Sequence, residues 1–270
     1  MLRTSGLTKR FGGLTAVDGV DFELGSDELC SLIGPNGAGK TTFFNLLTGT
    51  LDPTGGSVEY REAEGDWVDV TDDDPHEMAL RGLHRSYQIT NVFPTATALE
   101  NVRVAAQADG GRDAWKLWRN VGAFEGYERE ARGILERVGL GDEADTAAET
   151  LSHGQKRHLE VAVALAGDPD VLLLDEPTAG VSSDAIDRLV ELIRNVAADH
   201  AVLLVEHNMD VVMDVSDRVA VLHQGELIAD GEPSAVREDP AVRKAYLGGY
   251  EGGDDADAGD GGRTAGGEAA

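Results

Sequence analysis

The stretch Gly34-Pro35-Asn36-Gly37-Ala38-Gly39-Lys40-Thr41-Thr42 decides the fold of this chain. It matches the phosphate-binding pattern G-x-x-x-x-G-K-[ST], with the first glycine at Gly34 and the Gly-Lys-Thr end at residues 39–41. The apolar run Leu29–Ile33 precedes it and is typical of a buried strand, and apolar residues follow it at helical spacing up to Gly49. The order of strand, glycine-rich loop and helix therefore predicts an α/β fold with a phosphate site at the loop.

Glycines in such a loop let backbone N–H groups turn toward one point, and the helix N-terminus adds partial positive charge there. A nucleotide polyphosphate is the natural ligand, with Lys40 reaching the β- and γ-phosphates and the Thr41 hydroxyl holding Mg²⁺. The alternative is a glycine-rich turn that binds nothing. The predicted ATP-binding residues of this loop are Gly34, Pro35, Asn36, Gly37, Ala38, Gly39, Lys40, Thr41 and Thr42.

Two further apolar runs, residues 171–174 and Ala201–Val205, are continuous rather than alternating, which is typical of central parallel strands covered on both faces. A helical pattern between them completes a β-α-β unit, so we expect a doubly wound α/β core. From about residue 94 to 167 the pattern is helical, and Thr97 and Glu100 can form a capping box at the start of a helix there.

The remaining segments divide the chain into a large domain and a tail. Residues 17–24 and 57–60 are predicted to be early strands, and residues 219–229 a late hairpin. Residues 251–270 contain no large apolar side chain and are predicted to be a disordered, acidic, Gly- and Asp-rich tail. Residues 1–250 are then left for one domain with a substantial core.

The net charge is −27, and only −5 of it belongs to the tail, while five of the 23 basic residues are lysine. This composition suggests a salt-rich cytosol, because near molar salt the Debye length is about 3 Å and self-repulsion is screened. A surface made for a basic partner is the alternative. An unfolding temperature that does not rise between low and molar KCl would count against the halophilic interpretation. Such acidity opposes binding to nucleic acid.

Cysteine content and hydropathy indicate the compartment. Cys30 is the only cysteine, which excludes an intrachain disulfide, and its apolar surroundings indicate a small core residue more than a reactive thiol. No window of 18 apolar residues and no apolar segment near the N-terminus is present, so neither a membrane span nor a signal peptide is expected. A cytoplasmic protein is the default expectation.

The apolar run at residues 171–174 ends in Asp175-Glu176. A carboxylate at the carboxyl end of a parallel strand, near a phosphate loop, can bind the Mg²⁺ shared with the nucleotide, and Asp175 is the candidate. Glu176 can polarise a water for attack on the γ-phosphate. Alone, such a pair is often just a strand that ends in solvent.

Leu151-Ser152-His153-Gly154-Gln155 has the features of a helix N-terminus, with Ser152 as the capping residue and Gly154 for close approach, again suited to an anion. A plain capped helix is the alternative. The segment resembles the L-S-G-G-Q signature of ABC-type ATPases, and it lies 20 residues before Asp175. His153 departs from that pattern, where the family most often has glycine.

Three other positions match the ABC family in order along the chain, and a fourth departs from it. Phe11 matches the aromatic residue that stacks on adenine, although a core phenylalanine at a strand end is the alternative. Gln88 matches the loop glutamine that senses Mg²⁺ and water and faces the membrane partner. His207 matches the switch histidine at the γ-phosphate, and Ser182 stands where the family has an aspartate, which puts hydrogen bonding across a dimer in doubt there.

The resemblance covers residues 2–250 and implies a nucleotide-hydrolysing core with a mostly parallel sheet, an antiparallel part near the N-terminus and a helical subdomain at about 94–167. It implies catalytic roles for Lys40, Gln88, Glu176 and His207, Mg²⁺ ligation by Thr41, Gln88 and Asp175, and binding of a second subunit's ATP by Ser152, Gly154 and Gln155. The cofactors are ATP and Mg²⁺. Two subunits pack head to tail, as a homodimer or heterodimer.

Within the ABC family the chain resembles the importer subunits for branched-chain amino acids, on the motifs at residues 151–160, 206–213 and 245–248. The implied protein lies on the cytoplasmic face of the membrane, where it powers permease subunits and acts indirectly with a solute-binding protein. Urea-type and lipopolysaccharide-export ATPases share some of these motifs. The ATPase of a urea or amide importer, the ATPase of a lipid or lipopolysaccharide exporter, and a non-transport ABC protein remain alternatives.

Overall fold

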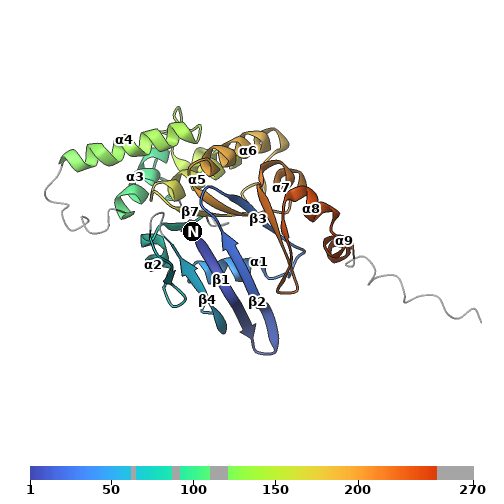
Figure 1. Cartoon of the computed structure of the whole chain (residues 1–270). Helices are drawn as coiled ribbons and strands as arrows, with labels where there is room; N and C mark the ends of the chain where they lie inside the picture. Colours follow the sequence, from blue (N-terminus) through green and yellow to red (C-terminus); the bar gives the residue numbers. More distant parts are fainter. Residues whose placement is uncertain (62–64, 87–91, 110–120, 248–270) are drawn as a thin grey trace, which may run out of the picture.

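Two β-sheets with helices around them form the fold (Figure 1). The computed structural model describes residues 1–61, 65–86, 92–109 and 121–247. Among these residues the larger sheet has the strand order β10-β9-β3-β8-β7-β6 and the smaller one β2-β1-β4-β5. The mostly parallel core and the antiparallel part near the N-terminus are confirmed.

The larger sheet places the ends of its parallel strands at one edge. β3, β8, β7, β6 and β9 are parallel, and β10 runs antiparallel to β9 as the predicted hairpin. All residues of the first three are buried, as continuous apolar runs require. The strands are β3 (Leu29–Ile33), β6 (Leu83–Arg85), β7 (Val171–Asp175), β8 (Ala201–Val205), β9 (Arg218–His223) and β10 (Glu226–Gly231).

The smaller sheet is antiparallel and contains a strand that the sequence pattern does not predict. This strand is β1, whose pairing with β2 and β4 shifts register at several points, so its polar and apolar residues do not alternate regularly. The polar segment after residue 61 also contributes the short strand β5. The strands are β1 (Leu2–Phe11), β2 (Leu14–Leu24), β4 (Gly55–Tyr60) and β5 (Val68–Asp69).

Helix α1 (Lys40–Leu47) follows the glycine-rich loop and packs into the core shared by both sheets. Phe43 and Phe44 are fully buried, and Phe43 meets Phe22 of β2 edge to face at 5.7 Å between ring centroids. The loop is therefore anchored at both ends, by a buried strand and by a buried helix.

The region at about 94–167 contains helices in its described parts, and helices α3 and α4 lie at the end of the molecule away from the β1–β2 turn (Figure 1). The predicted capping box is present, with Glu100 N–H donating to Thr97 Oγ1 at 3.1 Å and Thr97 N–H to Glu100 Oε2 at 2.8 Å. These elements are α3 (Ala98–Asp109), α4 (Val121–Arg137), the 3₁₀ helix η2 (Ala148–Thr150) and α5 (His153–Leu165).

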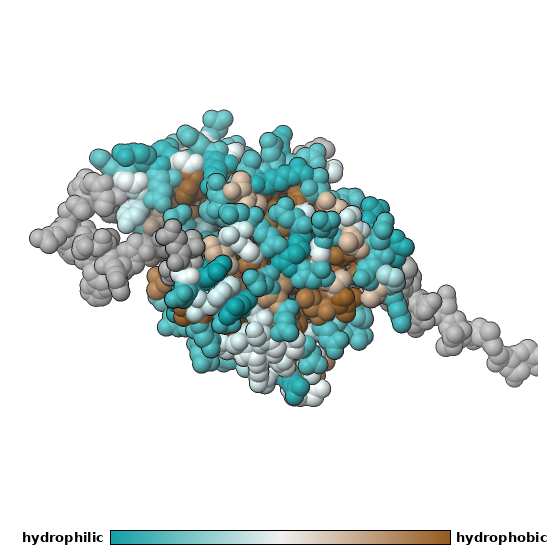
Figure 2. Space-filling model, in the orientation of Figure 1, coloured by the Kyte–Doolittle hydropathy of each residue, from teal (hydrophilic) through white to brown (hydrophobic). Residues whose placement is uncertain are grey.

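The other helices connect or flank the strands of the larger sheet. They are α2 (Pro75–Leu80), α6 (Ser183–Ala197), α7 (Met209–Val215), α8 (Pro233–Glu238) and α9 (Pro240–Leu247). None of the helices in the described ranges is long and apolar enough to cross a lipid bilayer. The face of the molecule in Figure 2 is mostly hydrophilic, with small apolar patches, in keeping with the charged composition.

Candidate functional site

Lys40 folds back into the glycine-rich loop. Its Nζ donates to Gly34 O at 2.6 Å and to Pro35 O at 3.2 Å, and only 7% of the residue is exposed. Burial lowers the pKa of Lys40, while the charges of Glu176 and Asp175 act in the opposite direction. The ammonium group therefore lies within electrostatic range of both predicted carboxylates.

The N-terminus of α1 carries no side-chain cap. Its N-cap residue is Gly39, which has no side-chain acceptor, so the N–H groups of the first helical turn remain available to an anion. The helix dipole adds positive potential at the same place. The local geometry therefore suits a phosphate group.

Two glycines of this loop touch backbone atoms of other strands. A Cβ at Gly34 would lie 2.1 Å from Leu222 O of β9, and one at Gly39 would lie 2.3 Å from Ala16 O of β2. Gly39 also has a φ of 105°, which side chains rarely allow. The loop is thus held against both sheets, and only glycine fits at these two positions.

A cavity of about 610 Å³ opens over the loop. It brings together the predicted residues Phe11, Glu176 and His207 with the loop residues 36–42. Phe11 is 47% exposed, so the alternative of a core phenylalanine is wrong. The remaining lining residues, which sequence reasoning did not single out, are Leu14, Thr15, Ala16 and Gln224.

Glu176 and His207 form a pair at the edge of this cavity. His207 Nε2 lies 2.7 Å from Glu176 Oε1, and Glu176 has the positive φ of 48°. The two residues follow the neighbouring strands β7 and β8, whose carboxyl ends meet at one edge of the sheet. This arrangement places an acceptor and an imidazole where a water could attack a bound phosphate.

Asp175 ends β7 and is paired with a residue that the sequence did not point to. Its Oδ2 accepts from Arg85 Nη2 at 2.7 Å, with both side chains buried, and Arg85 Nη1 also donates to Asn45 Oδ1 at 2.6 Å. Arg85 thus links β6 to the predicted metal-binding carboxylate. No local motif marks it, because the contact depends on the pairing of β6 with β7.

The oxygen atoms at the site suit Mg²⁺. A hydroxyl at Thr41 and a carboxylate at Asp175 are hard ligands, and Mg²⁺ typically takes one or two of these together with phosphate oxygens and water. Groups of three or more His, Cys, Asp or Glu side chains that could hold a metal ion without a nucleotide do not occur in the described ranges. The donor set therefore fits a metal that arrives with a nucleotide.

The start of α5 is a separate place on the surface. Gln155 N–H donates to Ser152 Oγ at 3.3 Å, Ser152 N–H donates to Gln155 Oε1 at 3.0 Å, and Gln155 Nε2 donates to Glu143 at 2.8 Å. Ser152, Gly154 and Gln155 line a cavity of about 490 Å³ that shares no residue with the one over the glycine-rich loop. Within one chain the two helix starts do not form one site.

Four other predictions have different outcomes. Gln88 and the tail at residues 251–270 lie outside the described residues. Cys30 is fully buried, and burial raises its pKa to about 12, so it is a core residue as predicted. Ser182 is the N-cap residue of α6 but makes no side-chain cap bond.

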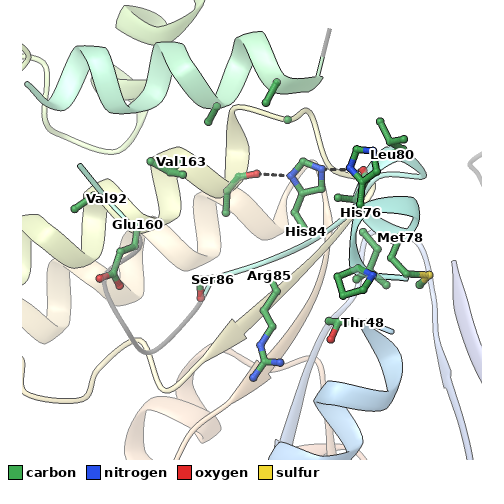
Figure 3. Close-up of a pocket in the computed structure, with 17 residues that line it drawn as sticks. Thr48, His76, Met78, Leu80, His84, Arg85, Ser86, Val92, Glu160 and Val163 are labelled. Carbon is green, nitrogen blue, oxygen red and sulfur yellow. Dashed lines mark hydrogen bonds between the residues drawn. The ribbon is translucent and has the colours of Figure 1, made fainter. Parts of the chain in front are cut away.

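A further cavity of about 370 Å³ lies between α5 and the α2–β6 segment (Figure 3). Val163 and Glu160 of α5 form one wall and Met78 and Leu80 of α2 the other. His84 spans the two helices, with Nδ1 3.0 Å from Ala164 O and Nε2 3.1 Å from Ala79 O. We refer to this cavity as the α2–α5 groove.

Two features suit the α2–α5 groove to a partner. Leu80 at its rim is 55% exposed, and Phe93, next to its lining residue Val92, is 58% exposed. Glu160 Oε1 is buried without a hydrogen-bond partner within the described part of the chain, although Oε2 accepts from Arg157 at 2.6 Å. Arg85 lines the same groove and reaches Asp175, so the groove and the candidate metal site share a residue.

Comparison with known proteins gives consistent matches. The family model for ABC transporters matches residues 17–179, and the model for branched-chain amino acid ATP-binding cassette transporters matches residues 226–252. The high-affinity branched-chain amino acid transport ATP-binding protein BraF of Pseudomonas aeruginosa is 41% identical over 92% of this chain and 98% of its own length. The high-affinity branched-chain amino acid transport ATP-binding protein LivG of Escherichia coli is 39% identical, over 92% of this chain and 98% of its own length.

Solved structures agree with these relatives. The ADP conformation of MJ1267, an ATP-binding cassette of an ABC transporter, superposes with a TM-score of 0.79 at 31% identity, over 92% of this chain and 98% of that one. MJ0796, a bacterial ABC transporter cassette solved as a dimer, superposes with a TM-score of 0.71 at 26% identity, over 86% and 99%.

Proposed function

The chain belongs to the ATP-binding cassette transporter family, among the branched-chain amino acid transport ATP-binding proteins, and on that premise we propose that it hydrolyses ATP to drive import of branched-chain amino acids. The observation that carries the solute class is the match of residues 226–252 to the branched-chain family model, together with relatives of that class aligned over nearly their full length.

The residues around the cavity over the glycine-rich loop have separate roles in ATP hydrolysis. Lys40 and the uncapped N–H groups of α1 hold the phosphates, and Phe11 offers an exposed ring to the adenine. Glu176 orients and polarises the attacking water, and His207, 2.7 Å from it, holds Glu176 toward the γ-phosphate. When Mg²⁺ is bound with the nucleotide, Thr41, Asp175 and Gln88 would hold it, and it would supply neutralisation of charge on the phosphates.

The α5 start acts on the nucleotide of another chain. Ser152, Gly154 and Gln155 lie apart from the cavity that holds Lys40, so they can contact a nucleotide only across an interface. Head-to-tail pairing of two cassettes supplies that interface, as a homodimer or with a related subunit, and the solved dimer of MJ0796 supports such pairing. ATP then favours the closed dimer, and hydrolysis reopens it.

The α2–α5 groove is the docking surface for the membrane permease. Its apolar rim at Leu80 and Phe93 suits the apolar face of a helix. Arg85 connects the groove to Asp175. In this arrangement the chain lies at the cytoplasmic face of the membrane, and a solute-binding protein acts on it indirectly through the permease.

The proposed function is tested by solute uptake in the source organism. Deletion of the gene is expected to remove high-affinity uptake of radiolabelled leucine, isoleucine and valine, and the wild-type gene should restore it while the variant Glu176→Gln should not. Urea is the comparison solute, and its uptake should be unchanged. Unchanged uptake of all three amino acids in the deletion strain would overturn the proposed solute class.

A further inference from the structure

Glu206 is a buried acid next to the candidate catalytic pair, and the proposed chemistry gives it no role. It follows β8 directly and is 3% exposed. Both carboxyl oxygens accept backbone hydrogen bonds: Oε1 from Thr178 N–H at 2.8 Å, and Oε2 from His207 N–H at 3.1 Å and Asn208 N–H at 3.5 Å. A buried acid engaged through both oxygens is costly to disturb.

The donors come from two different loops. Thr178 belongs to the turn after β7 that begins at Glu176, where Ala179 N–H donates to Glu176 O at 3.0 Å. His207 and Asn208 belong to the loop that leads from β8 into α7, which Asn208 caps. Through Glu206 one side chain therefore ties the loop of Glu176 to the loop of His207.

Glu176 needs such support because its backbone is strained. A non-glycine residue at a φ of 48° persists only where its surroundings hold it. On one side Glu176 N–H donates to Val205 O at 2.8 Å. On the other side the turn is fixed two residues later by the bond from Thr178 to Glu206.

We propose that Glu206 is a positioning residue that sets the distance between His207 and Glu176 for ATP hydrolysis. It does not touch the nucleotide, since the cavity over the glycine-rich loop is lined by Glu176 and His207 and not by Glu206. The inference rests on the proposed ATPase function, and it differs from a purely structural role in acting through His207.

A double-mutant cycle separates the two roles. The full-length chain is compared with Glu206→Gln, His207→Ala and the double variant, in single-turnover ATP hydrolysis and in binding of a fluorescent ATP analogue. The glutamine replaces one acceptor oxygen with an NH₂ group that faces N–H donors. We expect the hydrolysis rate to fall about 10- to 100-fold, as for a small misplacement of reacting groups, with nucleotide affinity changed less than about twofold.

In the His207→Ala background, Glu206→Gln is expected to lower the rate by a clearly smaller factor, because the position of His207 no longer matters and only the hold on the Glu176 turn is lost. Equal losses in both backgrounds, a wild-type rate for Glu206→Gln, or a parallel loss of nucleotide affinity would each overturn the inference. A wild-type chain without ATPase activity would overturn the proposed function as well, which distinguishes the two failures.

A second variant, which keeps the carboxylate, keeps the test valid if Glu206→Gln does not fold. Glu206→Asp retains the charge but is one methylene shorter, so it cannot reach both loops. We expect the same loss of rate, again clearly smaller in the His207→Ala background. Glu238→Gln on the exposed end of α8 is the matched control, expected to have the wild-type rate. Full wild-type activity of a folded Glu206→Asp would contradict positioning.

Discussion

Helix α1 begins without a side-chain cap at Gly39, whereas α5 begins with Ser152 and Gln155 bonded to each other in a complete capping box. The first start packs against both sheets and faces the cavity over the loop, and its lysine is 7% exposed. The second is at the surface, with Ser152 exposed. Both are helix N-termini suited to anions. The N–H groups at the start of α1 have no side-chain acceptor, whereas the start of α5 already has one.

This difference indicates how the two starts are used. The α1 start has free N–H donors and a buried ammonium group, so it is complete except for the phosphate. The α5 start is satisfied by its own side chains and stable without a ligand. A phosphate can gain affinity there only as part of an interface, which supports a site shared by two chains.

The largest effect should come from the general base beside the α1 start. Glu176→Gln keeps the shape of the side chain but removes its basicity, so turnover should fall about 10²- to 10⁴-fold with ATP binding retained. A coupled assay for ATP hydrolysis measures this, with Glu238→Gln as the matched control. Turnover within a few-fold of wild type would remove Glu176 from the chemistry.

The second-largest effect should come from removing the ammonium group of Lys40 at the start of α1. Lys40→Ala removes a charged donor from the phosphate site, and ATP affinity should fall about 10- to 100-fold, the value of a hydrogen bond to a charged group. Titration calorimetry with ATP tests this. Ser152→Ala in the same titration should leave the ATP affinity of a single chain unchanged. Equal losses of ATP affinity in both variants would show that the two helix starts do not differ in this way.

A matched pair of glycine substitutions distinguishes the packing of the two starts. Gly39→Ala would place a Cβ 2.3 Å from Ala16 O at a strained φ, so unfolding free energy should fall by about 1–3 kcal/mol. At Gly154 a Cβ would lie 3.4 Å from the Cβ of Ala185, an ordinary contact, and alanine in a helix gains about 0.5–1 kcal/mol. Chemical denaturation should show a lower unfolding free energy for Gly39→Ala and a higher one for Gly154→Ala. A change of the same sign in both variants would contradict the difference in packing between the two helix starts.

The smallest loss of stability should follow from removing the cap of α5. Ser152→Ala removes the acceptor for Gln155 N–H, which costs about 1 kcal/mol of stability. Thr150→Ala, which removes a hydroxyl bonded to the carbonyl of Ala147 just before the helix, is the comparison variant. A denaturation midpoint for Ser152→Ala equal to that of the wild type would show that the capping box contributes nothing.

The sequence predicted those parts of the site whose chemistry is local. The glycine-rich loop, the cap at Ser152 and the buried strands β3, β7 and β8 each follow from residues next to one another, and the structure has them. The capping box at Thr97 was predictable for the same reason.

The missed features depend on pairing between distant segments. Arg85 reaches Asp175 only because β6 lies beside β7, and Glu206 meets Thr178 only because β7 lies beside β8. The sequence pattern did not predict strand β1, because its register shifts disrupt the alternation of polar and apolar residues that is typical of a strand. Neither the contact of Glu176 with His207 nor the cavity over the loop could be derived without the order of the strands.

The proposed sharing of ATP between two chains is tested most directly by the mass of the Glu176→Gln chain in molar KCl, measured by size-exclusion chromatography with light scattering. With Mg²⁺ and ATP the mass should be twice that of one chain, and without ATP it should be that of one chain. Adding Ser152→Glu, which turns a carboxylate toward the partner's phosphate, should prevent the dimer while ATP still binds. A dimer that persists with Ser152→Glu would contradict a site built from both helix starts, and a single-chain mass for Glu176→Gln with ATP bound would exclude the homodimer and leave only pairing with a related subunit.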